Sequence, residues 1–161
     1  MASGQTRQKM NANQKIFLAI AVFGVLSDQI VKKAALVFLS GRPLYAGDFL
    51  GLEVYKNYGA AFGAPVSAGI FYPAVLIFLA ALLYAWPARL ASAKRAGKMS
   101  RVESAAFSLV FAGALSNTID RVSLGYIVDF ISINRLLFFN FADAMIVIGA
   151  VIILNGLLRK K

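Results

Sequence analysis

The sequence predicts an all-α integral membrane protein with four transmembrane helices and a small extracytoplasmic β-structure between helices 1 and 2. Two observations predict this class: 60% of the 161 residues are hydrophobic, and basic residues border long apolar runs. A soluble domain is nearer to about 45–50% apolar, so the excess indicates contact with lipid. The length fits one domain, which we expect to cover residues 1–161. The expected helices cover approximately residues 16–39, 69–87, 102–121 and 137–158.

The first predicted helix contains charged residues. Its apolar run starts at Ile16, is interrupted by Asp28, Lys32 and Lys33, and continues to Leu39. The beginning of this run, after a basic start, also resembles the core of a secretory signal peptide. No small-x-small cleavage site follows, and the apolar pattern resumes beyond Lys33, which favours a retained helix.

Three further apolar runs follow the first. Residues 70–86 carry no charge, and Tyr84 and Trp86 at their end suit a membrane interface. Residues 102–119 form the third run and residues 136–158 the fourth. Each run is close to the length that crosses a hydrocarbon core of about 30 Å, so hydropathy predicts four spans.

Basic residues set the predicted orientation. The segment from Arg89 to Arg101 contains several Lys and Arg and no acidic residue, whereas residues 41–67 carry no net charge. Because cytoplasmic segments are enriched in Lys and Arg, we expect both termini and the middle connection to be cytoplasmic. Residues 41–67 then face outside, and their β-branched and aromatic stretches, broken by glycines, predict short strands on the outer membrane surface.

The composition excludes several classes of chemistry. The chain has no Cys and no His, which rules out Cys nucleophiles, Ser-His-Asp triads, thiolate zinc sites and His-ligated metals. Its formal net charge of +10 does not indicate nucleic-acid binding, because the basic residues border apolar runs instead of forming a groove with aromatic residues. Acid–base chemistry must therefore come from Asp, Glu, Lys, Tyr or Arg.

Four of the seven acidic residues lie in or beside predicted membrane segments: Asp28, Asp120, Asp129 and Asp143. Ionisable residues at this depth are costly, so a functional role is the default interpretation. Asp28 has Lys32 four residues later, which favours a structural pair on one helix face. Asp120 is followed by Arg121, and a structural ion pair is again favoured for this carboxylate.

Asp129 and Asp143 differ because neither has a cationic partner nearby in the sequence. They flank the outer connection between the third and fourth predicted helices, so we expect both near the outer interface. Two carboxylates that meet in a site of low dielectric constant share a proton. Such a pair can activate water for aspartic-protease-like hydrolysis, and an ion or proton pathway is the alternative. Two amides at similar depth, Asn117 and Asn140, also need partners. Asn57 begins a glycine-rich stretch just outside the second predicted helix, which is either a turn or a place where a substrate backbone approaches and Asn57 bonds to it.

These residues occur in blocks that resemble those of the lipoprotein signal peptidases, the type II signal peptidases of bacteria. The resemblance covers the chain from the first predicted helix to the fourth. Its blocks, in order, are Asp28-Gln29 followed by Lys32; Asn57-Tyr-Gly-Ala-Ala-Phe62; Asn117-Thr-Ile-Asp-Arg121; Val128-Asp-Phe130; and Phe139-Asn-Phe-Ala-Asp143. Any one block is weak, but their order and separation make the combination specific.

The resemblance implies a single membrane-embedded peptidase domain that acts as an intramembrane aspartyl endopeptidase. In the family the catalytic pair occupies the positions of Asp129 and Asp143. Supporting or substrate-binding roles are implied for Asp28, Lys32, Asn57, Asn117, Asp120, Arg121 and Asn140. Ser116 departs from the pattern, because the family usually has glycine there, and Ser27 stands where an apolar residue often precedes Asp28.

The implied substrates are bacterial prolipoproteins, cleaved just before a cysteine that carries a diacylglyceryl group. The resemblance implies no metal and no cofactor, and we expect a monomer whose partners are these signal peptides and membrane lipid, not nucleic acid. The implied location is the bacterial cytoplasmic (inner) membrane, with several spans and the active site near the extracytoplasmic face. The alternative from the residues alone remains a small proton or ion pathway that uses the membrane carboxylates.

Overall fold

A computed structural model describes residues 10–59, 77, 80–81, 84 and 100–158. These residues form three long helices and one antiparallel sheet with the strand order β1-β2-β3-β4. The elements are α1 (Ala12–Phe38), β1 (Leu44–Ala46), β2 (Leu50–Asn57), α3 (Arg101–Leu124), β3 (Ile127–Ile133), β4 (Leu137–Phe139) and α4 (Phe141–Leu158).

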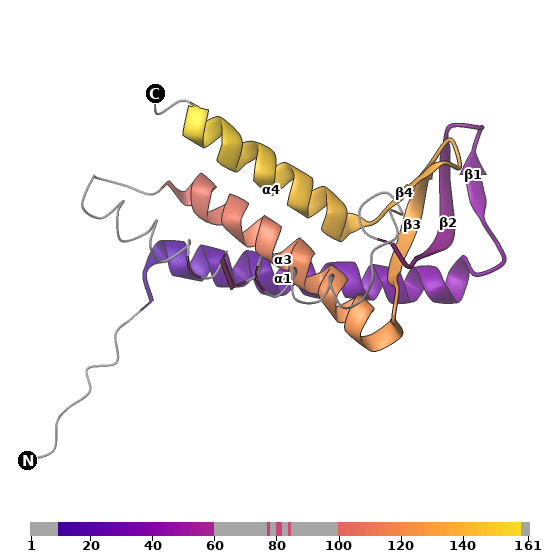
Figure 1. Cartoon of the computed structure of the whole chain (residues 1–161), viewed down its shortest axis with the longest axis horizontal. Coiled ribbons are helices and arrows are strands. Elements are labelled where there is room, and N and C mark those ends of the chain that lie inside the picture. The colour runs from indigo at the N-terminus through magenta and orange to yellow at the C-terminus, as the bar shows by residue number, and fades with distance from the viewer. Residues whose placement is uncertain (1–9, 60–76, 78–79, 82–83, 85–99, 159–161) are drawn as a thin grey trace, which may run out of the picture.

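The helices lie roughly along the long axis of the molecule, and the sheet stands at one end of them (Figure 1). The first residues of α1 and α3 and the last residues of α4 lie at the opposite end. Helix α3 packs against both α1 and α4. The sheet therefore meets the helices where α1 ends and α4 begins.

Local sequence explains where the helices start and stop. Asn11 caps α1 and forms a capping box with Gln14, and Ser100 does the same for α3 with Glu103. Such boxes satisfy backbone N–H groups that have no partner inside the helix. Helix α3 ends at Leu124 and is capped by Gly125, whose φ of +82° is a left-handed conformation that glycine adopts without steric cost.

All three helices are long and apolar enough to cross a membrane. Helix α1 has 27 residues, or about 40 Å at roughly 1.5 Å per residue. Helices α3 and α4 have 24 and 18 residues. The helix predicted over residues 69–87 lies almost entirely outside the described residues, so the fourth span remains a prediction. The assignment of the two ends to the cytoplasm also remains a prediction.

The sheet confirms one expectation and corrects another. The strands expected between the first two helices are present as β1 and β2. The other half of the sheet was not predicted: β3 and β4 come from the connection between α3 and α4. Residues 137–139, expected to begin the fourth helix, form β4 instead, because their backbone pairs with residues 131–133 of β3. Helix α4 starts only at Phe141.

A tight turn makes this second hairpin possible. Asn134 and Arg135 have φ values of 52° and 56°, and the N–H of Leu136 donates to the carbonyl of Ile133 at 3.0 Å. Positive φ at both central positions is typical of a type I′ turn, whose twist matches a β-hairpin. Strand β3 also pairs with β2, where Asp129 lies opposite Tyr55.

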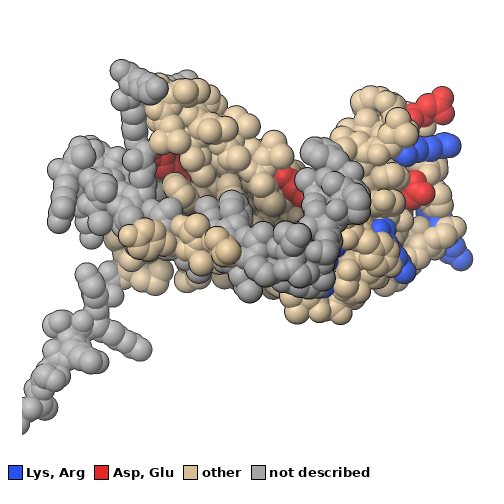
Figure 2. Space-filling model, in the orientation of Figure 1, with Lys and Arg blue, Asp and Glu red and all other residues tan. Residues whose placement is uncertain are grey.

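Charge is unevenly distributed over the molecule. On the face drawn in Figure 2, basic and acidic side chains gather over the sheet, while the described helical surface is almost entirely uncharged. Large apolar side chains of the helices are exposed, among them Phe23, Val37, Val122 and Leu158. Exposed apolar surface on this scale marks contact with lipid or with other apolar chain segments, which fits a membrane protein.

Small residues let α3 approach α4 closely. A Cβ atom at Gly113 would overlap the carbonyl oxygen of Ala142 and would lie 2.8 Å from a side-chain carbon of Ile146. A Cβ atom at Gly149 would lie 2.6 Å from the carbonyl oxygen of Ala106. These glycines therefore set the separation of α3 and α4, and with it the position of the first turn of α4.

We expect Gly113→Ala to lower the free energy of unfolding by about 1–3 kcal/mol, because overpacking forces backbone shifts. The matched control is Gly156→Ala in α4, where a Cβ atom would meet only Glu103 Oε1 at 3.8 Å. That change should be neutral or stabilising by about 0.5–1 kcal/mol. Denaturation in detergent micelles measures both, and equal effects would contradict this packing.

Candidate active site

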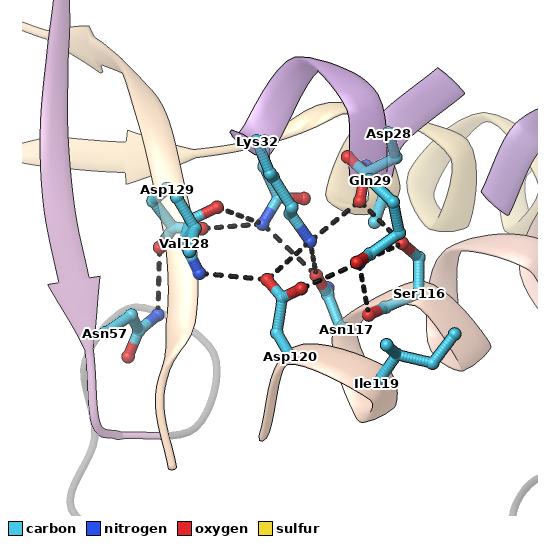
Figure 3. A network of polar contacts seen from close by, with 12 residues as sticks. Asp28, Gln29, Lys32, Asn57, Ser116, Asn117, Ile119, Asp120, Val128 and Asp129 are labelled. Carbon is cyan, nitrogen blue, oxygen red and sulfur yellow. Dashed lines mark hydrogen bonds and ion pairs between the residues drawn. The ribbon is translucent and has the colours of Figure 1, made fainter. Parts of the chain in front are cut away.

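Buried polar side chains gather where α1, α3, β2, β3 and the start of α4 meet (Figure 3). Their burial is unusual because charged side chains are almost never fully buried unless they are paired. The buried members are Asp28, Lys32, Asn57, Ser116, Asp120, Arg121, Asp129 and Asn140. The structure therefore brings together most of the residues that the sequence singled out.

Lys32 lies at the centre of the first part of this network. Its Nζ lies 2.7 Å from Asp28 Oδ2 and 3.0 Å from Asp120 Oδ2. It also donates to Asn117 Oδ1 at 2.8 Å. The pair of Asp28 with Lys32 on one helix face is thus confirmed. Asp120 also forms an ion pair, but with Lys32 on α1, whereas the sequence favoured its neighbour Arg121.

Asp28 connects three helices. Its Oδ2 accepts from the hydroxyl of Ser116 on α3 at 2.7 Å, and its Oδ1 accepts from the backbone N–H of Ala142 on α4 at 3.0 Å. Ser116 Oγ also accepts from Gln29 Nε2 at 3.0 Å. The bond to Ala142 holds the first turn of α4, the turn that carries Asp143.

Asp120 connects α3 to the beginning of β3. Its Oδ1 accepts from Gln29 Nε2 at 2.7 Å, and its Oδ2 accepts from the backbone N–H of Val128 at 3.0 Å. Val128 is the neighbour of Asp129 in β3. The carboxylate of Asp120 therefore fixes the strand at the residue beside Asp129.

Asp129 is 1% exposed and receives a side-chain amide on each oxygen. Asn57 Nδ2 donates to Oδ2 at 3.1 Å, and Asn140 Nδ2 donates to Oδ1 at 2.7 Å. The orientation of Asn57 follows from its other contact, because its Oδ1 accepts from the N–H of Gly59 at 3.0 Å. The end of β2 and the residue before α4 thus hold this carboxylate.

Asp143 lies in the first turn of α4. Its Oδ1 accepts from Asn117 Nδ2 at 2.8 Å, and its Oδ2 accepts from the backbone N–H of Asn140 at 3.3 Å. In return the N–H of Asp143 donates to Asn140 Oδ1 at 2.9 Å. This reciprocal arrangement resembles a capping box, in which the residue before a helix and the third helical residue satisfy each other.

The two carboxylates are neighbours, because Asn140 contacts both of them. Burial raises the pKa of Asp129 to about 7, and the negative charge of Asp143 adds to the effect. The hydrogen bonds from Asn57 and Asn140 and the charge of Lys32 act in the opposite direction. Near neutral pH Asp129 can therefore either hold a proton or release it, as a group in acid–base catalysis must.

Arg121 fastens the end of β2 to α3. Its guanidinium donates to the carbonyl oxygen of Tyr58 at 2.7 Å and also to that of Gly59. These carbonyls directly follow Asn57. The resemblance implied a supporting or substrate-binding role for Arg121; here it binds backbone carbonyls of its own chain and so fixes the strand that presents Asn57.

Gln29 and Ser116 belong to the network but were not among the predicted site residues. Gln29 bonds to Ser116 and Asp120, and Ser116 bonds to Asp28. The available signals were the position of Gln29 inside a recognised block and the departure of Ser116 from glycine. Among the described residues, no group of three or more Asp, Glu, His or Cys is placed to hold a metal ion.

Comparison with known proteins gives consistent matches over most of the chain. Residues 20–159 match the family described as signal peptidase (SPase) II. A lipoprotein signal peptidase of Staphylococcus aureus is 33% identical over 156 residues, covering 88% of this chain and 87% of that protein. One of Acinetobacter baumannii is 32% identical over 148 residues, covering 86% and 81%. A solved bacterial membrane enzyme superimposes with a TM-score of 0.74 at 33% identity, covering 90% of this chain and 88% of its own.

The fold and the site define a membrane protein with two neighbouring carboxylates suited to acid–base chemistry, of which Asp129 is buried and Asp143 half-buried. Three of its helices could cross a membrane, and the solved structure that it resembles is a membrane enzyme, so both observations indicate a membrane protein. The chain belongs to the signal peptidase II family, and is therefore a protease.

We expect Ser116→Ala to lower the free energy of unfolding by about 1.5–3 kcal/mol, because a hydrogen bond to a charged group is lost. Ser108→Ala is the matched control: Ser108 lies buried on the same helix but donates to a neutral acceptor, the carbonyl of Phe17, at 2.6 Å. Its loss should cost about 0.5–1.5 kcal/mol. Denaturation in micelles compares the two, and an equal or larger effect at Ser108 would contradict this role of Ser116.

Proposed function

We propose that this chain is an intramembrane aspartyl endopeptidase that removes the signal peptide from diacylglyceryl-modified prolipoproteins by cleaving before the lipidated cysteine. Asp129 and Asp143 are the catalytic pair in this proposal. The observation that carries it is the meeting of these two carboxylates at Asn140, with the pKa of Asp129 raised to about 7 by burial and by its negative neighbour.

The proposed chemistry needs one carboxylate and one carboxylic acid. The ionised member takes a proton from a water molecule, and the water oxygen bonds to the carbonyl carbon of the scissile peptide. The protonated member gives its proton to the carbonyl oxygen. When the tetrahedral intermediate collapses, the C–N bond breaks and the carboxylic acid formed in the first step gives its proton to the leaving amine. The other carboxylate takes a proton from a hydroxyl of the intermediate, so the pair is again singly protonated.

The hydrogen bonds around the pair support this assignment. Side-chain NH2 groups of Asn57, Asn117 and Asn140 all donate to carboxylate oxygens of the pair. These donors hold each carboxylate in a defined position, as catalysis requires of groups that must be preorganised. Each amide is in turn fixed by another contact of its own.

The location of the pair supports the choice of substrate. Asp129 lies on β3 and Asp143 in the first turn of α4, at the end of α4 where the sheet stands (Figure 1). A signal peptide is itself an apolar segment, and its cleavage point emerges at the end of a membrane span. The lipid on the cysteine would remain among the lipids and present the adjacent peptide bond to the pair, a proximity effect.

The names of the relatives add the substrate class. The proteins of Staphylococcus aureus and Acinetobacter baumannii are named lipoprotein signal peptidases, and prolipoproteins become the proposed substrates of this chain on that ground. The proposed location is the bacterial inner membrane, with the sheet and the pair at the extracytoplasmic face, as the distribution of basic residues predicts.

We expect Asp129→Asn and Asp143→Asn each to reduce cleavage of a purified, diacylated prolipoprotein by about a thousandfold or more, because neither variant retains a pair that shares a proton. The matched control is Asp48→Asn, an exposed residue of the β1–β2 turn, which should cleave at the normal rate. Gel-based processing assays in micelles measure all three.

Normal cleavage by either variant of the pair would show that the assignment is wrong. The absence of cleavage by the unchanged protein, together with a proton flux in liposomes that requires Asp129, would favour the proton-pathway alternative.

A further inference from the structure

The ammonium group of Lys32 has one acceptor for each of its three protons. Two are the carboxylates of Asp28 and Asp120, at 2.7 and 3.0 Å, and the third is Asn117 Oδ1 at 2.8 Å. Lys32 is only 2% exposed. The first two contacts stabilise the fold. The third is with Asn117 (Figure 3), whose NH2 group donates to Asp143 of the proposed catalytic pair.

The contact with Lys32 determines how the Asn117 amide is turned. An ammonium group can only donate, so the amide must present its oxygen to Lys32. Its NH2 group then faces the other way and donates to Asp143 Oδ1 at 2.8 Å. The same amide oxygen also accepts from Asn140 Nδ2 at 3.2 Å, so a rotated amide would lose favourable contacts on both sides.

The same reasoning extends to the other carboxylate. Asn140 uses its Oδ1 to accept from the N–H of Asp143, which leaves its NH2 group to face Asp129 Oδ1 at 2.7 Å. A single amide therefore separates Lys32 from Asp143, and two amides separate it from Asp129. The buried positive charge is connected to both carboxylates through groups of fixed orientation.

We propose that Lys32 is a positioning residue for this reaction: its buried charge turns the Asn117 amide toward Asp143 and sets the pH range in which the pair carries one proton. This inference rests on the proposed function and names the group that tunes its site. Lys32 touches neither the substrate nor the reacting atoms, because it is buried and acts through Asn117.

The distance is short enough for the charge to matter. Two hydrogen bonds of 2.8 Å and the amide between them separate the ammonium nitrogen from Asp143 by no more than about 8 Å. At that distance and an effective dielectric constant of about 20, a unit charge changes a proton affinity roughly 10- to 30-fold. The charge of Lys32 also opposes the rise in the pKa of Asp129.

Other groups around the pair act with or against Lys32. Asp28 and Asp120 carry negative charge on α1 and α3, Arg121 carries positive charge on α3, and Tyr55 lies opposite Asp129 on β2. Because Asp28 and Lys32 carry opposite charges, removal of one charge should shift the pH range in which the pair carries one proton in the opposite direction to removal of the other. This opposition separates an electrostatic role from a purely structural one.

The test is the pH dependence of kcat for a diacylated prolipoprotein, measured with the full chain in micelles. Lys32→Gln keeps a hydrogen-bond donor but loses the charge, so both protons of the pair bind more tightly. Its bell-shaped profile should move to higher pH by about one unit or more, with little change in KM. Lys32→Arg keeps the charge and should keep the position of the profile.

Asp28→Asn removes a negative charge instead of a positive one and should therefore move the pH profile to lower pH. It also keeps the inference testable if Lys32→Gln does not fold. A pH profile of Lys32→Gln that changes in height but not in position would overturn the inference. If Lys32→Gln does not fold, the same result for Asp28→Asn would overturn it.

Asp129→Asn and Asp143→Asn, assayed in parallel, separate this inference from the proposed function. If they cleave normally, the proposed function is wrong. If they are inactive and the Lys32→Gln profile does not move, only the role of Lys32 is wrong.

Discussion

Each buried carboxylate needs hydrogen-bond donors, and these hydrogen bonds connect the helices and strands of the structure. Asp28, Asp120 and Asp129 are each at most 2% exposed, and a buried charge without partners costs several kcal/mol. The donors come from different elements: Asp28 receives the N–H of Ala142 on α4, and Asp120 receives the N–H of Val128 on β3. The bonds that satisfy these charges therefore also fasten the start of α4 and the start of β3 to α1 and α3.

This arrangement places the two proposed catalytic residues on elements of different kinds. Asp129 lies on a strand and Asp143 in the first turn of a helix, and each follows directly after a residue that Asp120 or Asp28 holds. Close packing of α3 against α4 at Gly113 limits the movement of that first turn. The rigid scaffold supplies the positions, and Asn140, which both caps α4 and bonds to Asp129, joins the two carboxylates into one site.

The sequence predicted the parts of this site that depend on local spacing or on chemical type. The pair of Asp28 and Lys32 followed from their separation by one helical turn, and Asp129 and Asp143 stood out as carboxylates without local cations. Strand β4 was missed because Leu137–Phe139 continues into the apolar run of α4, so hydropathy carries no sign of the boundary at Asn140. The contact of Lys32 with Asp120 and the bond of Ser116 to Asp28 join different helices, and no spacing rule along one chain segment reveals them.

The central claim is that Asp129 and Asp143 share a proton near neutral pH. The most direct measurement is an infrared titration of protein with isotope-labelled aspartate, following the protonated-carboxyl band that Asp129→Asn removes. We expect this band to titrate near neutral pH, because burial and the charge of Asp143 raise the pKa of Asp129 to about 7, and to move to lower pH in Asp143→Asn. A band that titrates near the ordinary value of 3.8, and that Asp143→Asn leaves in place, would contradict the claim.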